Sequence, residues 1–528
     1  MILAEINNFD TKSFRKLLLK DGLKKTWMNI IFTHLTNKHK FAYILESPEY
    51  RAARILPKNY IDGLTIGEIS VLYEYSVALI NSKSRKSNGQ FFTPDDVAKF
   101  MAKFSKDFGA GIWLDPCSGI GNLSWHLVNA QRDPEKFLLN NLILSDKDDL
   151  ALLIARVLLT ISFQKNHLKL YFDIKEKFIS FDFLSVSDNG QLDLFGSKDY
   201  LQKIPKHDFV IVNPPYLAVK KDTRFETSNA GDLYSYFMEN IIKTSRGFIS
   251  ITPQSFTNAK KFQSLRKLLL NNYPNFKVFT FDNVPANIFK GIKFGSKNSN
   301  QANSIRAAIT VASASAGKQR ITGLVRWRTS ERALVFDHIE EFLSEVPLSD
   351  QFFPKVSSDY EGIYRNLIEQ PTLRTIAKTQ KTKYPLHIPS APRYFIPALK
   401  KAAKRASQKT IYFDSESDRD YAYMLINSSV MYWWWRVRDG GMTLSLETLM
   451  SLPLPQFKVN KKIVEALENS EKTSKVYKQN AGAAQENVKH PKSLVDQLNH
   501  FIIPDYAKLL GSLHENSELT RLIKQKKY

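Results

Sequence analysis

A short apolar run that ends in two prolines is the feature that most constrains this chain. Residues 209–212 read Phe-Val-Ile-Val, which is typical of a strand buried on both faces. Pro214 and Pro215 lack the N–H that a strand ladder needs, so they must end that strand. The sequence therefore predicts a buried strand and a stiff turn that holds Asn213 and Tyr216 close together.

This turn groups acceptors and an aromatic ring that suit a planar base with an amino group. The Asn213 side-chain oxygen and the Pro214 carbonyl can both accept hydrogen bonds from such an amine. Tyr216 can stack on the ring of the base. The alternative is an ordinary turn at the end of a strand, and these four residues alone do not decide between the two.

A loop with two glycines follows an earlier expected strand. The chain reads Asp-Pro-Cys-Ser-Gly-Ile-Gly-Asn over residues 115–122, and a helix is expected to begin near residue 123. The two glycines let the backbone approach a ligand, as in the dinucleotide-type turn. The third phosphate-binding glycine is missing, and the acidic strand end suits an amino group instead, such as that of S-adenosylmethionine. The alternative is an ordinary strand–helix turn. The candidate cofactor-binding residues here are Asp115, Pro116, Ser118, Gly119, Gly121 and Asn122.

Acidic residues also end the next two expected strands. Residues 141–145 lead into Asp146, which we assign to the ribose hydroxyls, with Asp148 as the reserve. The following strand leads into Asp182 and Phe183, which suit an adenine amine and its ring. Each carboxylate alone could be merely solvated. Their shared position at successive strand ends favours a site, because open α/β sheets bind ligands at that edge.

Phe92, Thr93 and Pro94 precede the glycine loop and indicate the start of a helix. We expect Thr93 at the N-cap and Pro94 at the first helical position. Asp95 and Asp96 then suit the positive end of the helix. The alternative interpretation is a well-capped helix with no role in binding.

The charge balance indicates a polyanionic partner. The chain has 75 Lys and Arg against 52 Asp and Glu, a net charge of +23. Such a charge favours nucleic acid or an acidic membrane surface, and nucleic acid is the simpler expectation. The sequence has no apolar run of membrane-spanning length and no signal-peptide pattern, so we expect a cytoplasmic protein. One cysteine excludes an internal disulfide and a cysteine zinc cluster, and we expect no metal.

The alternation of expected strands and helices predicts an α/β fold with several domains. A helical cap is expected over 1–84, where apolar residues recur at helical spacing. A doubly wound, Rossmann-like sheet is expected over 85–325. An α+β recognition domain should occupy 326–456, and helices should fill 457–528. Within the last segment, residues 470–492 are polar and predict a linker.

A segment with many basic and no acidic residues lies in the expected recognition domain. Residues 371–410 contain ten Lys and Arg and no Asp or Glu. Such a run is usually a solvated face, but on a chain of +23 it favours contacts with phosphates. The candidate DNA-binding residues are Lys400, Lys401, Lys404 and Arg405. The three tryptophans at 433–435 are expected in the core rather than on a base-stacking surface.

The order of these motifs resembles the bacterial DNA adenine methyltransferases of the gamma arrangement, which are restriction-modification enzymes. Phe-Thr-Pro, Asp-Pro-Cys-Ser-Gly-Ile-Gly, Asp-Phe and Asn-Pro-Pro-Tyr follow one another over residues 85–315. The resemblance implies methyl transfer from S-adenosylmethionine to the 6-amino group of adenine, flipped out of duplex DNA. It implies a cofactor site at Phe92, Thr93, Pro94, Asp115, Pro116, Ser118, Gly119, Gly121, Asn122, Asp146, Asp182 and Phe183. It implies a catalytic turn of Asn213, Pro214, Pro215 and Tyr216. The base would stack on Tyr216 and on Phe289, with Phe294 as a nearby alternative.

Two other interpretations remain open at this point. Methyltransferases of RNA or of protein glutamine also use Asn-Pro-Pro-Tyr, although the Phe-Thr-Pro helix and the basic C-terminal region weigh against them. A non-catalytic DNA-binding subunit of a restriction complex could keep the same fold, but the intact acidic strand ends argue against it. As a modification enzyme, the protein would act separately from any cognate restriction endonuclease.

Overall fold

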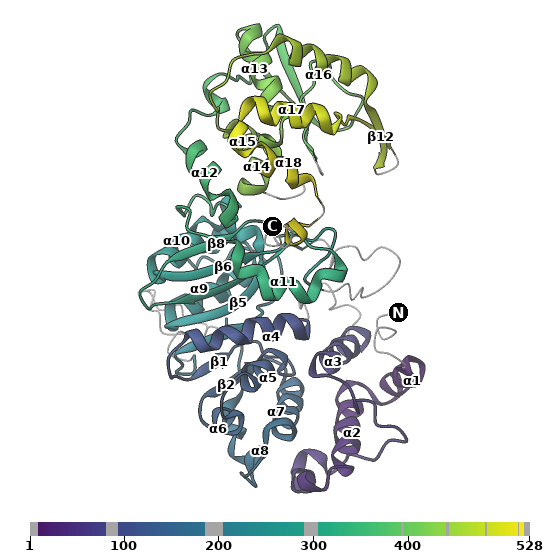
Figure 1. Cartoon of the computed structure of the whole chain (residues 1–528). Coiled ribbons are helices and arrows are strands. Elements are labelled where there is room, and N and C mark those ends of the chain that lie inside the picture. The colour runs from purple at the N-terminus through teal and green to yellow at the C-terminus, as the bar shows by residue number, and fades with distance from the viewer. Residues whose placement is uncertain are drawn as a thin grey trace. The chain divides into compact units, whose positions relative to one another are not determined.

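The chain divides into two units of structure, which are described separately. In the computed structural model, the first unit is Met1–Phe256 with Lys260–Gln319, and the second is Thr257–Ala259 with Arg320–Tyr528 (Figure 1). The structure describes residues 9–80, 93–184, 204–289, 305–391, 395–439, 443–480, 483–515 and 517–521. Of the residues singled out above, Phe92 and Phe294 lie outside these ranges.

The first unit begins with helices that share an apolar core with the sheet domain. These are α1 (Thr11–Asp21), α2 (Leu23–Thr36) and α3 (Ile66–Ile80), with 3₁₀ turns between α2 and α3. Trp27 and Ile30 of α2 are fully buried, in one cluster with Ile154 and Leu158 of α7 (Asp149–Phe163). The helices predicted from the apolar spacing are present, and this spacing places one face of each against the core.

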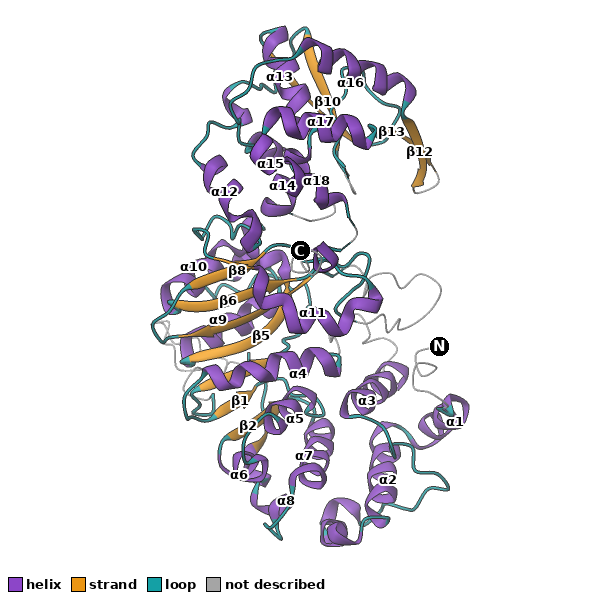
Figure 2. Ribbon diagram, in the orientation of Figure 1, coloured by secondary structure: helices purple, strands orange, loops and turns teal. Residues whose placement is uncertain are grey.

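A twisted, mostly parallel sheet forms the centre of the first unit (Figure 2). The strands of the sheet that lie wholly within this unit are, in order, β3 (Phe178–Ser180), β2 (Leu142–Asp146), β1 (Trp113–Asp115), β4 (Phe209–Val212), β5 (Gly247–Pro253), β7 (Ala307–Ser313) and β6 (Asn275–Thr280). The pairs from β3 to β5 are parallel, and β7 runs antiparallel between β5 and β6. The predicted Rossmann-like α/β class is confirmed.

Helices cover the sheet and bury its strands. They are α4 (Asp95–Lys103), α5 (Asn122–Asn129), α6 (Pro134–Asn140), α7, α8 (Leu170–Asp173), α9 (Leu233–Thr244) and α10 (Gln263–Asn272). All four residues of β4 are buried, as its continuous apolar run requires. From β1 the chain moves outward to β2 and β3, and it then returns to the other side of β1 as β4. This change of direction is the switch point at which such sheets bind ligands.

Two local predictions are wrong. The helix expected to be capped by Thr93 begins at Asp95, and Pro94 is its N-cap. Thr93 is engaged elsewhere, because its carbonyl accepts from Asn122 Nδ2 and its hydroxyl from Asn213 Nδ2. The linker predicted at 470–492 is instead regular structure: α16 (Lys461–Thr473), the hairpin β12–β13 (Lys475–Asn480 and Ala483–Val488) and the start of α17 (Lys492–Ile502).

The second unit is mixed α and β. Its antiparallel pair β10–β11 (Tyr384–Pro389 and Gln408–Phe413) stands with α11 (Arg332–His338), α12 (Glu361–Ile368), α13 (Glu416–Asn427), α14 (Ser429–Arg438), α15 (Leu446–Met450), α16, α17 and α18 (Ala507–Gly511). Trp433, Trp434 and Trp435 are all at most 3% exposed, so the prediction that they are core residues is confirmed. Within the described ranges of both units, every helix is too short or too polar to cross a membrane.

Candidate active site

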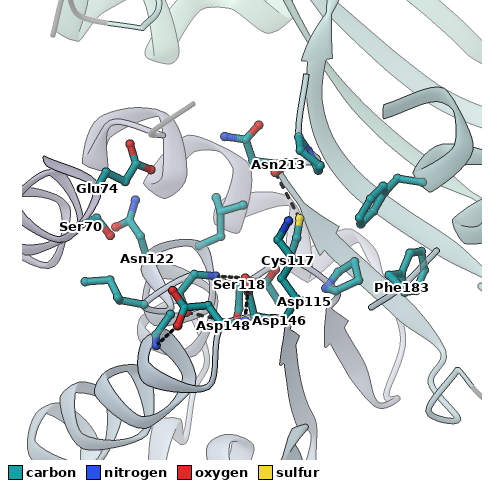
Figure 3. A pocket seen from close by; sticks show the side chains of 18 of the residues that line it. Ser70, Glu74, Asp115, Cys117, Ser118, Asn122, Asp146, Asp148, Phe183 and Asn213 are labelled. Carbon is teal, nitrogen blue, oxygen red and sulfur yellow. Dashed lines mark hydrogen bonds between the residues drawn. The ribbon is translucent and has the colours of Figure 1, made fainter. Parts of the chain in front are cut away.

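A pocket of about 310 Å³ opens at the carboxyl ends of β1, β2 and β4 (Figure 3). Residues from all the predicted motifs meet there. The predicted residues that line it are Thr93, Asp115, Pro116, Ser118, Gly119, Asn122, Asp146, Asp182, Phe183, Asn213 and Pro215. Pro94, Gly121, Pro214, Tyr216 and Phe289 do not line the pocket. The parallel strands explain this meeting, because their carboxyl ends share one edge.

Asp115, the last residue of β1, is a buried carboxyl that is only half satisfied. Its side chain is 1% exposed, and Oδ2 accepts a hydrogen bond of 2.9 Å from the Ser124 hydroxyl. Oδ1 is buried, and none of the residues that the structure describes donates a hydrogen bond to it. Burial raises the pKa of Asp115 to about 7, and the neighbouring charge of Asp146 adds to the rise. This oxygen is an acceptor that lacks a donor.

Asp146, at the end of β2, fixes the glycine loop. Its Oδ2 accepts from the backbone N–H of Gly119 at 2.8 Å, and its Oδ1 accepts from that of Asp148 at 3.0 Å. Burial raises the pKa of Asp146 above its usual range. Asp148, the reserve candidate, caps α7 and accepts from the Tyr73 hydroxyl at 2.7 Å. Asp146 therefore stays the better candidate for the ribose, since Asp148 already serves the helix end.

Two glycines of the loop are required by its backbone. Gly119 and Gly121 have φ angles of 52° and 84°, in the left-handed region that other residues rarely adopt. A Cβ on Gly121 would also lie 3.2 Å from the Cβ of Ala155 in α7. The loop therefore passes close to α7 and leaves its ligand-facing side open.

Asp182 and Phe183 form the wall of the pocket beyond β3. Phe183 is 2% exposed and stacks on Phe237, with ring centroids 5.2 Å apart. Asp182 Oδ1 accepts from the backbone N–H of Leu184 at 3.0 Å. A carboxylate beside stacked rings suits an aromatic ligand that carries an amine.

Asn213 is held in one orientation by its neighbours. Its Nδ2 donates to the Thr93 hydroxyl at 2.9 Å, and its Oδ1 accepts from the Tyr216 hydroxyl at 2.6 Å. The Tyr216 oxygen also lies 2.8 Å from the carbonyl of Ile251. Burial raises the pKa of Tyr216 well above its usual range, so this hydroxyl stays protonated and keeps its proton to donate. The Asn213 amide is therefore preorganised by the hydroxyls of Thr93 and Tyr216.

An aromatic cluster lies beside this turn. The Tyr216 ring lies 6.3 Å from the Phe289 ring and 6.2 Å from the Tyr234 ring, both in edge-on contact. Phe289 was expected near the turn only from the resemblance, and the structure brings it to Tyr216.

Family models match the part of the chain that forms the pocket. Residues 65–142 match the N-6 DNA methylases, and residues 140–289 match the Eco57I restriction-modification methylases. This part of the chain is therefore similar to DNA methylases. The match to the N-6 DNA methylases starts at residue 65, so α3 lies inside the matched region.

Two similar proteins of known name are type II methyltransferases. M.BsuBI of Bacillus subtilis is 30% identical over 205 residues, which are 36% of this chain and 38% of that protein. M.PstI of Providencia stuartii is 24% identical over 225 residues, which are 40% of this chain and 42% of that protein. The chain thus matches about two fifths of the length of these relatives.

Solved structures are similar at lower identity. A DrdV–DNA complex aligns with 73% of this chain and 45% of its own, at 13% identity and a TM-score of 0.42. The type IIG restriction endonuclease BpuSI aligns with 97% of this chain and 79% of its own, at 10% identity and a TM-score of 0.42.

The pocket has a wall that the sequence motifs did not predict. Ser70, Tyr73, Glu74 and Val77, all from α3, line it. Burial raises the pKa of Glu74 to about 7. The available signal was an acidic residue within an otherwise mostly apolar helical segment, and this residue lies outside every strand-end motif.

The basic candidates lie in the second unit, and the structure divides them. Lys400 Nζ pairs with Asp420 at 2.6 Å and Glu468 at 2.5 Å, and its side chain is only 14% exposed. Lys401 and Lys404 are exposed. Arg405 is half-buried and donates to the Ser407 carbonyl and to Asn487 Oδ1. Lys400 thus has a structural ion pair, whereas its neighbours Lys401 and Lys404 extend into solvent.

Proposed function

We propose that this chain transfers a methyl group from S-adenosylmethionine to the 6-amino group of adenine in duplex DNA. One observation carries the proposal: Asn213 and Pro215 of the Asn-Pro-Pro-Tyr turn line the same pocket as the acidic strand ends. The matched N-6 DNA methylase model supports it. The enzyme would protect DNA as the modification member of a restriction-modification system, separate from a cognate endonuclease.

The pocket fits a cationic cofactor. S-adenosylmethionine supplies a methyl group that its sulfonium has already activated. The ammonium and sulfonium are positive, and the pocket offers the unpartnered Oδ1 of buried Asp115. Asp115, Thr93 and the loop at Gly119 would hold the amino-acid part. Asp146 would take the ribose hydroxyls, and Asp182 and Phe183 the adenine ring.

Asn213 would position the target amine. Its Oδ1 and the Pro214 carbonyl would accept the two N–H groups of the amine, which turns the nitrogen lone pair toward the methyl group. The same acceptors stabilise positive charge as it develops on that nitrogen. Thr93 supports this role, because its hydroxyl accepts from Nδ2 and so holds the side-chain amide in place.

The target base must leave the duplex to reach this pocket. Flipping a base costs a few kcal/mol. Stacking on Tyr216, with Phe289 beside it, would offset that cost. In the second unit, Lys401, Lys404 and Arg405 would contact phosphates, and Lys400 would contribute less because acidic side chains already hold it.

A methyl-transfer assay with three substrates tests the proposal. The purified chain is incubated with labelled S-adenosylmethionine and with unmethylated bacterial DNA, total RNA or cell protein. We expect label in DNA alone, and N6-methyladenine after digestion to nucleosides. The Asn213→Ala variant is the control for contaminating activity. Label in RNA or protein, or N4-methylcytosine in DNA, would overturn the proposal, and so would bound cofactor without transfer.

A further inference from the structure

Glu74 is a carboxylate of the pocket that no motif explains. It lies on α3 with Ser70, Tyr73 and Val77, and all four line the pocket. Figure 3 shows its carboxylate extending from α3 on the side of Asn122 and Asn213, away from Phe183. In the described part of the chain, no hydrogen bond or ion pair reaches this carboxylate, whereas Tyr73 on the same helix donates to Asp148.

Keeping an unpaired carboxylate in this position is unfavourable for the protein alone. Burial disfavours the charged form, which is why the pKa of Glu74 rises to about 7. The neighbouring positions Ile69, Val71 and Leu72 are buried apolar residues of the same helix. Glu74 itself is only half-buried, at the wall of the pocket, so a ligand that pairs with the carboxylate would explain why a glutamate stands there.

Two further acceptors of the pocket also lack donors. Asp115 Oδ1 and Asn122 Oδ1 are buried and have no hydrogen-bond partner among the described residues, and the two side chains belong to residues that are 1% and 7% exposed. Both residues line the pocket together with Glu74. An ammonium group has three donors and no acceptor, so it complements this set. A phosphate or a carboxylate would instead be repelled by it.

The place of Glu74 in the pocket indicates which part of the cofactor it would contact. Phe183 marks the end proposed for the adenine ring, and Glu74 lies on the opposite side in Figure 3, toward Asn213. We propose that Glu74 accepts a hydrogen bond from the ammonium of the cofactor's amino-acid part, so that α3 is a binding element of the methylase and not only a packing helix. This inference rests on the proposed cofactor and adds a binding residue to it.

The proposal also links the cofactor to the N-terminal helices. Ile69 and Leu72 of α3 belong to the apolar cluster that contains Trp27 and Ile30 of α2. A contact between Glu74 and the ligand would therefore hold α3 against this cluster. Amide hydrogens of α3 should exchange more slowly when the ligand carries its amino group.

Calorimetry with two ligands tests the inference. S-adenosylhomocysteine retains the α-amino group, and a deamino analogue of it differs only there. Glu74→Gln should weaken binding of S-adenosylhomocysteine at least tenfold and binding of the deamino analogue less than twofold. Glu68→Gln is the matched control on α3: its carboxylate accepts from the Thr65 backbone N–H and does not line the pocket, so both affinities should stay unchanged.

The outcomes separate this inference from the proposed function. If Glu74→Gln lowers the affinity for the two ligands equally, or for neither, the proposed role of Glu74 is wrong. Binding of S-adenosylhomocysteine by the wild type would still support the proposed cofactor. Failure of the wild-type chain to bind S-adenosylhomocysteine would overturn both. Hydrogen exchange of the wild type keeps the test independent of the variant's folding: slower exchange in α3 with S-adenosylhomocysteine than with the deamino analogue is expected, and equal exchange contradicts the inference.

Discussion

The pocket of the first unit and the interior of the second unit differ in whether their buried charged groups have partners. In the second unit, Arg326 and Arg436 are 2% and 6% exposed and share Glu518, with N–O distances of 3.4 and 3.1 Å. In the pocket, Asp115 has an unpartnered buried oxygen, and Glu74 has no partner in the described residues.

This difference separates groups that stabilise a fold from groups that await a ligand. Buried polar groups in proteins are nearly always satisfied, so each exception needs an explanation. In the second unit the chain supplies both members of each of these pairs. In the pocket, the described residues provide no donor for the buried acceptors Asp115 Oδ1 and Asn122 Oδ1, as in a site whose donors come with a ligand.

The largest expected effect is the loss of stability when the buried ion pairs of the second unit are broken. Glu518→Ala would remove the carboxylate that the two buried guanidinium groups of Arg326 and Arg436 share, and should lower the free energy of unfolding by about 3–5 kcal/mol. Urea unfolding followed by tryptophan fluorescence measures this decrease. Cofactor affinity of the folded variant should be unchanged. Glu515→Ala, at an exposed position, is the control, and a similar decrease there would remove the argument.

Asp115→Asn should instead increase the stability of the ligand-free protein. The folded pKa of about 7 lies above the usual value of 3.8, so the stability that the protonated form contributes is complete below about pH 4 and is lost as the pH rises to 7. Asn does not titrate. At pH 8 the ligand-free variant should therefore be more stable than wild type, by up to about 4 kcal/mol for a pKa raised by about three.

The same variant should bind S-adenosylmethionine at least tenfold more weakly, because it lacks the negative charge. Melting temperatures at pH 5 and pH 8 and calorimetric titration measure the two effects. Asp62→Asn, at an exposed carboxylate outside the pocket, is the control. A variant that is destabilised equally at both pH values would show that Asp115 is a structural residue.

Asn213→Ala probes the reacting end of the pocket. Single-turnover methylation should fall about a hundredfold, the scale of losing one preorganised hydrogen-bonding group. Cofactor and DNA affinities should change little, because phosphate contacts dominate DNA binding. Asn213→Asp keeps an acceptor and should retain more activity than Ala.

Tyr216→Phe keeps the ring but removes the hydroxyl that orients Asn213, so its methylation rate should fall less than that of Asn213→Ala. Wild-type rates in the Ala variant would contradict the catalytic role.

The smallest effects distinguish neighbouring lysines. Replacing both Lys401 and Lys404 with Ala should lower the slope of log affinity against log salt by up to about 0.9 for each phosphate that the protein no longer neutralises. Lys400→Ala should leave that slope unchanged and destabilise the fold, since Glu468 and Asp420 lose this ion pair and Asp420 keeps only Arg419. Identical slopes for wild type and both variants would mean that this segment does not bind DNA.

The sequence by itself determined the sheet and the edge at which the site lies. The apolar run before Asn213 required a buried strand, and the two prolines required it to end there. Asp115, Asp146 and Asp182 follow strands, and parallel strands bring their carboxyl ends to one edge. Local rules of this kind depend on neighbours in the chain, so one sequence suffices to apply them.

Only the tertiary structure decided which charges are paired. Lys400 and Lys401 are adjacent and chemically identical, yet Lys400 meets Asp420 and Glu468 from distant segments. From the sequence, Glu74 is only a polar residue in a helix that packs against the core. The structure shows that it lines the pocket. The physical reason is that burial and charge pairing depend on side chains far apart in sequence, and their energies follow from the three-dimensional neighbours rather than from the residue type.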